Sequence, residues 1–256
     1  MNTPFEFPKQ SFYLFSYPRS GNTWLILSLE MLLHAARAEA RSEFDLWTHV
    51  YGEKGADTFW LKTEDALDME RPLIIKSHET YDAYKTLYPK NKCVYIYRDG
   101  RDVMLSYYFY TKIFANKEKV VIEAVGDKQV LEARTTDAVN FDETEFADFL
   151  NQHVLEWAKH VNGWLNAPNA YILTYEGLHQ DFKGKLTEIV DYLKIKPYVD
   201  VSEVEQDYVN SFKELFTGDN RRFFRKGVVG DWKNYFTENH VKIFSDLTKN
   251  LKYVSS

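Results

Sequence analysis

Four short apolar runs, separated by helical patterns, constrain the fold of this sequence more than any other feature. The runs cover residues 11–17, 72–77, 92–97 and 170–174. Each run is largely apolar on both faces, which is typical of strands in a parallel sheet that helices cover. Apolar residues at helical spacing fill parts of the intervals, at residues 23–37, 101–114 and 141–165. The alternation predicts an α/β protein with a doubly wound, parallel β-sheet flanked by helices.

The length of the chain, 256 residues, suits one such domain and is too short for two with separate cores. Because there is no internal repeat or Pro/Gly-rich linker, we expect a single domain over residues 1–256. The formal net charge of −6 argues against a nucleic-acid or anionic-membrane partner. Cys93 is the one cysteine, which excludes an intrachain disulfide. Without a signal-peptide pattern or a membrane-length apolar run, we expect cytoplasmic residence.

The segment that follows the first run is suited to binding an anion. Ligands of doubly wound sheets bind at the carboxyl ends of the strands, so the residues after each run are the candidates. Here residues 17–24 read YPRSGNTW and lead into a helix. Such a junction offers backbone N–H groups and a helix N-terminus to an anion, and Arg19 adds a fixed charge. The segment lacks the Gly-x-x-x-x-Gly-Lys-Ser/Thr pattern of a P-loop, and a capped helix after an ordinary turn is the alternative.

The second run ends in a cation and an imidazole. Lys76 and His78 are two residues apart, so they point to the same side of an extended chain. The lysine could stabilise developing negative charge, and the histidine could act as a general base. A satisfied surface histidine is the alternative.

Two further segments carry basic residues. Arg98 follows the third run, and Ser106 comes eight positions later, a combination that suits a phosphate group. Asp99 and Asp102 could instead pair with the arginines and form a purely structural cap. Residues 225–234, which read RKGVVGDWKN, place two adjacent cations beside glycines. This segment could fold over an anionic ligand, or it could be a charged turn.

Together, these four segments resemble the cytosolic-type sulfotransferase family in their order and spacing. Residues 17–24 are similar to its 5'-phosphosulfate loop, and residues 97–106 to its 3'-phosphate motif. Residues 76–78 (KSH) resemble its Lys-Thr-His segment, and residues 225–234 nearly match its C-terminal signature. The resemblance covers residues 11–237. It implies a P-loop-like sulfotransferase fold and transfer of a sulfuryl group from 3'-phosphoadenosine-5'-phosphosulfate (PAPS) to a hydroxyl or amine of a small acceptor, releasing PAP.

The resemblance also implies roles for the matching residues. His78 would be the general base, and Lys76 would stabilise charge on the leaving phosphate. The implied cofactor site comprises Arg19, Ser20, Gly21, Asn22, Thr23, Trp24, Arg98, Ser106, Tyr175, Phe212, Arg225, Lys226 and Gly227. Arg19 stands where the family usually has a lysine, and we count it with the catalytic residues. Arginine keeps the charge but cannot donate a proton, so we expect Lys76 to carry more of that lysine's role.

The nature of the acceptor is open at this point. An acidic stretch contains Glu123, Asp127, Glu132, Asp137, Asp142, Glu143, Glu145 and Asp148. It could attract a cationic acceptor, such as an amine-bearing natural product, or it could be a solvated face. We expect no metal, although a helical pattern puts His153, Glu156 and His160 on one face. The family's dimer signature is only partly present, which leaves a monomer and a homodimer open.

Three other functions compete with this one. A sulfotransferase for glycans would need a long basic groove, which a net charge of −6 does not indicate. A nucleotide kinase would need a Walker-type lysine, which the first loop lacks. A non-catalytic nucleotide-binding protein would not need both Lys76 and His78.

Overall fold

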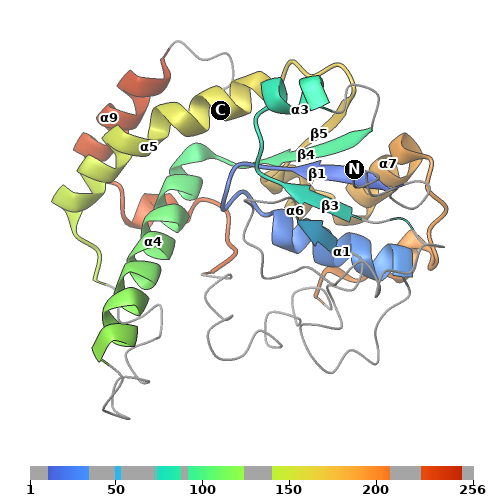
Figure 1. Ribbon diagram of the computed structural model, residues 1–256, viewed down its shortest axis with the longest axis horizontal. Helices are drawn as coiled ribbons and strands as arrows, with labels where there is room; N and C mark the ends of the chain where they lie inside the picture. The colour runs from blue at the N-terminus through green and yellow to red at the C-terminus, as the bar shows by residue number, and fades with distance from the viewer. Residues whose placement is uncertain are drawn as a thin grey trace, which may run out of the picture. The chain divides into compact units, whose positions relative to one another are not determined.

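The computed structural model of the chain describes two compact units (Figure 1). The described residues are 11–34, 50–52, 72, 74–87, 92–123, 140–207 and 226–249. Unit 1 contains those that fall within residues 1–97 and 163–215, and unit 2 those within 98–162 and 216–256. The single domain over residues 1–256 stays a prediction.

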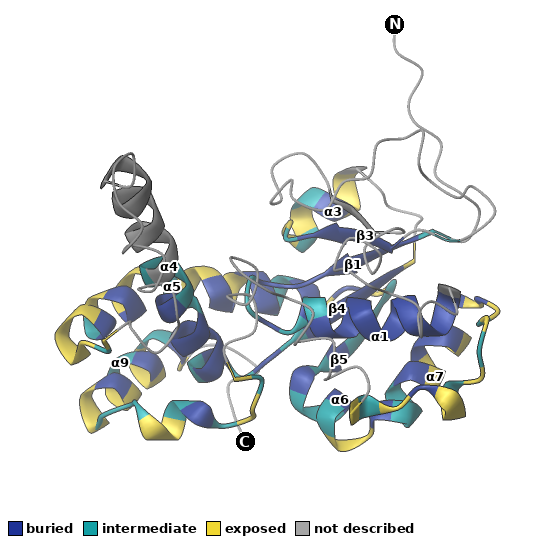
Figure 2. Cartoon of the chain, turned by 90° about the horizontal axis from the view of Figure 1, so that it is seen from below, coloured by how far each residue is buried: buried dark blue, intermediate teal, exposed yellow. Residues whose placement is uncertain are grey.

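Unit 1 is built on a five-stranded parallel sheet with the strand order β2-β3-β1-β4-β5. The strands are β1 (Phe12–Phe15), β2 (Val50–Gly52), β3 (Ile74–Ser77), β4 (Cys93–Tyr97) and β5 (Ala170–Thr174). Every residue of β1 and β3 is buried, which explains why these strands are apolar on both faces (Figure 2). The four strands predicted from apolar runs are confirmed. β2 was missed because its three residues form no apolar run.

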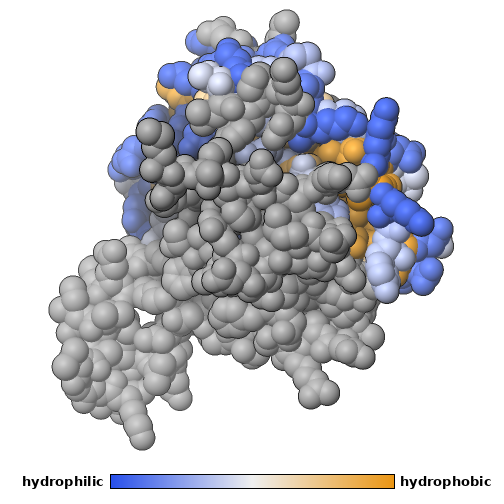
Figure 3. All heavy atoms as spheres, turned by 45° about the vertical axis from the view of Figure 1, so that its right-hand side comes forward, coloured by the Kyte–Doolittle hydropathy of each residue, from blue (hydrophilic) through white to orange (hydrophobic). Residues whose placement is uncertain are grey.

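The helices of unit 1 begin where a strand ends or where a polar side chain caps them. They are α1 (Asn22–His34), α3 (Tyr81–Leu87), α6 (Tyr175–Gln180) and α7 (Phe182–Leu193), and a 3-10 turn covers Val201–Glu203. Thr174 Oγ1 accepts a hydrogen bond from the Gly177 N–H at the start of α6, and Asp181 Oδ1 accepts one from Gly184 at the start of α7. In the view of Figure 3, the described surface combines hydrophilic side chains with a smaller hydrophobic area.

Aromatic rings fill the core of unit 1 beside the sheet. Trp164 is fully buried, with its ring centroid 4.4 Å from that of Phe15 and 5.0 Å from that of Tyr95. Its Nε1–H donates to the carbonyl oxygen of Glu79 at 3.0 Å, so its polar atom is satisfied. Cys93 is also buried here, and loss of hydration raises the pKa of its thiol to about 12, against a smaller lowering by the Tyr84 hydroxyl.

Unit 2 is helical. It contains α4 (Gly100–Glu123), nearly all of α5 (Glu143–Trp164), a 3-10 turn at Asp231–Asn234 and α9 (Glu238–Thr248). A capping box starts α9: Thr237 Oγ1 accepts from the His240 N–H, and His240 Nδ1 accepts from the Thr237 N–H at 3.1 Å. The other ring nitrogen of His240 donates to the carbonyl oxygen of Glu143 at 2.8 Å. This buried histidine therefore links the starts of α9 and α5.

The predicted helical segments agree with the structure. The pattern at residues 101–114 lies in α4, the pattern at 141–165 matches α5, and the pattern at 23–37 matches α1 as far as residue 34. Among the helices in the described part of the chain, none is long and apolar enough to cross a membrane.

Candidate active site

The loop between β1 and α1 has a backbone that few residues can adopt. Arg19 has φ = 70° and Gly21 has φ = 98°. Arg19 is therefore a non-glycine residue held in the left-handed region, which costs free energy. At Gly21, an added Cβ would lie 2.3 Å from Cδ2 of Tyr175. Both the dihedral angle and this contact require glycine, and the contact places Tyr175 directly against the loop.

The same loop contains buried polar atoms that no described residue satisfies. Among the described residues, Ser20 Oγ, Asn22 Nδ2 and Trp24 Nε1 are buried and have no hydrogen-bond partner. Buried polar groups in folded proteins are normally hydrogen-bonded, and leaving one unsatisfied costs about 1–3 kcal/mol. All three can donate hydrogen bonds, and donors beside a helix N-terminus suit an anionic, oxygen-rich group.

The Trp24 ring is enclosed by side chains of unit 1. It stacks on His179 with centroids 4.4 Å apart, and the rings of Tyr175 and Phe182 each lie 5.5 Å away. His179 was not predicted as a site residue, because no sequence motif marks it. The binding of the cofactor by Trp24 stays a prediction.

Lys76 and His78 lie at the carboxyl end of β3, which pairs with β1, the strand that leads into the loop. The register puts Lys76 opposite Leu14, and Lys76 is buried. His78 Nδ1 lies 2.6 Å from the carbonyl oxygen of Ser16. A carbonyl oxygen only accepts hydrogen bonds, so Nδ1 carries the proton. In the neutral ring, the lone pair is therefore on Nε2, as a general base requires.

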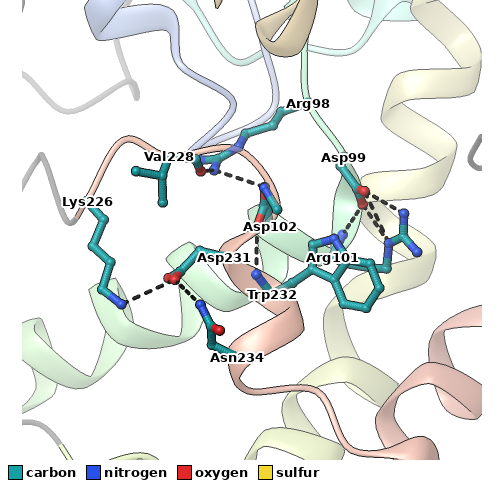
Figure 4. A network of polar contacts seen from close by, with 10 residues as sticks. Arg98, Asp99, Arg101, Asp102, Lys226, Val228, Asp231, Trp232 and Asn234 are labelled. Carbon is teal, nitrogen blue, oxygen red and sulfur yellow. Dashed lines mark hydrogen bonds and ion pairs between the residues drawn. The ribbon is translucent and has the colours of Figure 1, made fainter.

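In unit 2, Arg98 is held by a carboxylate and by a backbone carbonyl. Its Nη2 donates to Asp102 Oδ2 at 3.1 Å and to the carbonyl oxygen of Val228 at 2.5 Å (Figure 4). Arg101 pairs with Asp99 at 2.6 Å, and its guanidinium lies 3.9 Å from the centre of the Trp232 ring. Both acidic residues thus pair with arginines, as expected if Asp99 and Asp102 have a structural role at the start of α4. The binding of phosphate by Arg98 stays a prediction.

Residues 226–234, here called the C-terminal loop, turn at two glycines with positive φ, Gly227 at 67° and Gly230 at 80°. Lys226 Nζ donates to Asp231 Oδ1 at 3.2 Å and to the Tyr235 hydroxyl at 3.4 Å, while 47% of its side chain remains exposed. Burial lowers the pKa of Lys226, but these two hydrogen bonds outweigh that effect and raise its pKa. Lys226 is therefore a charged group at a turn.

The structure distributes the predicted site residues over both units. Unit 1 holds Arg19, Ser20, Gly21, Asn22, Thr23, Trp24, Lys76, His78 and Tyr175, and unit 2 holds Arg98, Ser106, Lys226 and Gly227. Ser106 is buried in α4. Phe212 and Arg225 lie outside the described residues. No group of three metal-ligating side chains occurs in the described ranges, and His153 Nδ1 is 3.9 Å from the Glu156 carboxylate.

Comparisons with known proteins agree with these features. A model of the sulfotransferase domain matches residues 9–253. Mouse Sulfotransferase 2A1 is 24% identical over 94% of this chain and 83% of its own length. Mouse sulfotransferase SULT7A1 complexed with PAP shares the fold with a TM-score of 0.60 and 22% identity, covering 95% of this chain and 87% of that one. Retinol dehydratase in complex with androsterone and inactive cofactor PAP has a TM-score of 0.61 and 20% identity, covering 97% and 83%. This chain therefore belongs to the sulfotransferase family and is an enzyme of that class.

Proposed function

We propose that this enzyme transfers a sulfuryl group from PAPS to a hydroxyl or amine of a small-molecule acceptor, with His78 as the general base, and releases PAP. The observation that carries the proposal is the hydrogen bond of His78 Nδ1 to the Ser16 carbonyl oxygen, because it puts the proton on Nδ1 and the basic lone pair on Nε2. The second support is the neighbouring loop, whose buried atoms Ser20 Oγ and Asn22 Nδ2 suit the oxygens of a phosphosulfate.

In this reaction, His78 Nε2 takes the proton of the acceptor as the new bond to sulfur forms. The bond between sulfur and the 5'-phosphate oxygen breaks in line with it, and the charge stays on the released PAP. Lys76 and Arg19 offset that charge, and the loop fixes the phosphate for an in-line geometry. Arg98, Ser106, Lys226 and Gly227 hold the 3'-phosphate, together with Arg225.

A small acceptor is supported by the relatives. The retinol dehydratase structure contains androsterone, a small molecule, beside PAP. We therefore propose an acceptor of natural-product size. Cytoplasmic residence stays a prediction from the sequence. A glycan acceptor is the second candidate, and the net charge of −6 argues against the basic groove that a polyanionic glycan would need.

The acidic stretch gives little support to a cationic acceptor in its described part. Asp142 Oδ1 accepts from the Glu145 N–H at 2.9 Å and so caps α5, while Glu145 pairs with Lys112. Glu143 and Asp148 are exposed. These roles favour a solvated face at a helix N-terminus, where acidic residues are stabilising. Sulfation of matched neutral and cationic alcohols at low and high salt tests the point, because a cationic preference that salt removes would reverse this conclusion.

An acceptor screen tests the proposed function. The protein is incubated with PAPS and a library of phenols, sterols, amines and oligosaccharides, and PAP release is measured together with product mass. We expect a mass increase of one sulfuryl group in a small acceptor, matched by equal PAP release. A parallel series with ATP and Mg²⁺ covers the kinase alternative. Phosphate transfer there, with no reaction from PAPS, would exclude the proposal.

A further inference from the structure

One buried carboxylate, that of Asp102, attaches the C-terminal loop to the start of α4. Asp102 is completely buried in unit 2. Its Oδ2 accepts from the Gly230 N–H at 2.7 Å, and its Oδ1 accepts from the Trp232 N–H at 2.9 Å. Arg98 Nη2 donates to Oδ2 as a third partner (Figure 4). Two elements more than a hundred residues apart in sequence therefore meet at this one side chain.

The arrangement fixes Arg98 as well as the loop. Arg98 Nη2 donates both to Asp102 and to the carbonyl oxygen of Val228, which belongs to the loop. A guanidinium is planar, so two bonds from one nitrogen in different directions restrict the orientation of the whole fork. Asp102, Arg98 and the loop thus form a closed network in which each member is bonded to the other two.

The energetics favour a role in positioning over a role in stability alone. Burying a carboxylate and a guanidinium carries a large desolvation cost, and apolar replacements of such pairs are often as stable. A buried charge with three well-aligned donors is instead suited to fixing one geometry. The groups that it fixes are Arg98 and the turn that carries Lys226 and Gly227, and these are proposed ligands of one phosphate.

We propose that Asp102 is the positioning residue of the 3'-phosphate site. It sets the Arg98 guanidinium and the C-terminal loop in the arrangement that binds the 3'-phosphate, and it does not itself touch the nucleotide. This inference rests on the proposed function, because it takes PAP as the ligand of these residues.

The test compares two nucleotides that differ only in the 3'-phosphate. Binding of PAP and of adenosine 5'-phosphate is measured by calorimetry for the full chain and for Asp102→Asn. The amide nitrogen must face one of the N–H donors, so the network is broken with almost no change of volume. We expect the dissociation constant for PAP to rise by about 30-fold and that for adenosine 5'-phosphate by less than about threefold. Asp99→Asn is the matched control, since Asp99 pairs with Arg101 and should leave the preference for PAP unchanged.

Two results would overturn the inference: a folded Asp102→Asn protein with the full preference for PAP, or one that loses affinity for both nucleotides equally.

Gly230→Ala gives a second test, this time by a change in the C-terminal loop. The positive φ of Gly230 disfavours alanine, while the nearest atom to an added Cβ is 4.0 Å away. A selective loss of about tenfold for PAP is expected, and it decides the matter if Asp102→Asn does not fold. Failure of the proposed function itself has a different signature, because the unmodified chain would then show no preference for PAP.

Discussion

The candidate residues of unit 1 and those of unit 2 are prepared for a ligand in opposite ways. In unit 1, the loop after β1 buries Ser20 Oγ and Asn22 Nδ2 without hydrogen-bond partners among the described residues. In unit 2, the cations Arg98 and Lys226 are already paired, with Asp102 and Asp231. An anion bound at the unit 1 loop would complete the hydrogen bonds of its buried groups. An anion bound in unit 2 would have to compete with or extend the contacts that Arg98 and Lys226 already make.

The difference teaches what each half can contribute to binding. Satisfying a buried polar atom recovers the cost of its burial, so unit 1 gains directly from an anion. A cation that exchanges a carboxylate for a phosphate gains only the difference between the two interaction free energies. Its side chain is, however, already held in one orientation before the ligand binds. We therefore expect substitutions in unit 1 to act on binding and chemistry, and substitutions in unit 2 to act on nucleotide selectivity and stability.

The largest effect is expected at His78. Replacement by alanine removes the proposed base, and kcat for sulfuryl transfer should fall by about 10³-fold while the dissociation constant for PAP stays within about twofold. Steady-state kinetics and calorimetry measure the two quantities. His153→Ala is the control, because this half-buried histidine in α5 has no part in the site. Simultaneous loss of PAP binding would show that His78 acts only through its bond to Ser16.

The next effect is expected at Gly21. An alanine there would have to adopt φ = 98° and accept a 2.3 Å contact with Tyr175, so the loop should shift and PAP binding should weaken by about 100-fold. Calorimetry on the folded variant measures this. Gly163→Ala is the matched substitution, since its Cβ would meet only Tyr81 at an ordinary 3.9 Å. Unchanged PAP affinity in Gly21→Ala would remove the loop from the binding site.

Substitutions of two cations in unit 2, Arg98 and Lys226, should differ in their effect on stability while both weaken PAP binding. Arg98→Ala leaves the Asp102 carboxylate buried without its charged partner, so the free energy of unfolding should fall by about 3 kcal/mol along with PAP affinity. Lys226→Ala affects a half-exposed side chain, and we expect about a tenfold loss of PAP affinity with little change in stability. Urea unfolding and calorimetry distinguish the two. Equal stability losses would contradict the difference in burial.

The smallest effects concern one helix cap in each unit. Thr174→Ala removes the cap of α6, and Thr237→Ala removes one half of the capping box of α9. Each should lower the free energy of unfolding by about 1 kcal/mol, as measured in urea. Only Thr174→Ala should also reduce PAP affinity, because it precedes Tyr175, which lies against the loop. A loss of PAP affinity in Thr237→Ala would show that the cap of α9 also affects the nucleotide-binding residues.

Local patterns predicted much of this molecule. The buried strands β1, β3, β4 and β5 are each a short apolar run, and the helices follow an amphipathic spacing that packing requires. The residues at the strand ends were predictable for the same reason, since parallel strands present their carboxyl ends on one edge of the sheet.

The contacts that organise the candidate residues within each unit were not predictable in this way. Asp102 binds backbone N–H groups of residues 230 and 232, and no sequence pattern marks a partner that lies so far along the chain. His179 stacks on Trp24 for reasons of packing alone. β2 is too short to show an apolar run, and its place beside β3 follows only from the sheet.

The buried Cys93 has a consequence for the behaviour of the enzyme toward oxidants. The reactive form of cysteine is the thiolate, and a pKa of about 12 keeps this side chain a thiol at physiological pH. It is the single cysteine of the chain, and it lies at the start of β4, buried in the core beside Tyr13 and Tyr84. An electrophile can therefore reach it only when the sheet opens. Alkylation of this one sulfur therefore reports how often the sheet of unit 1 opens.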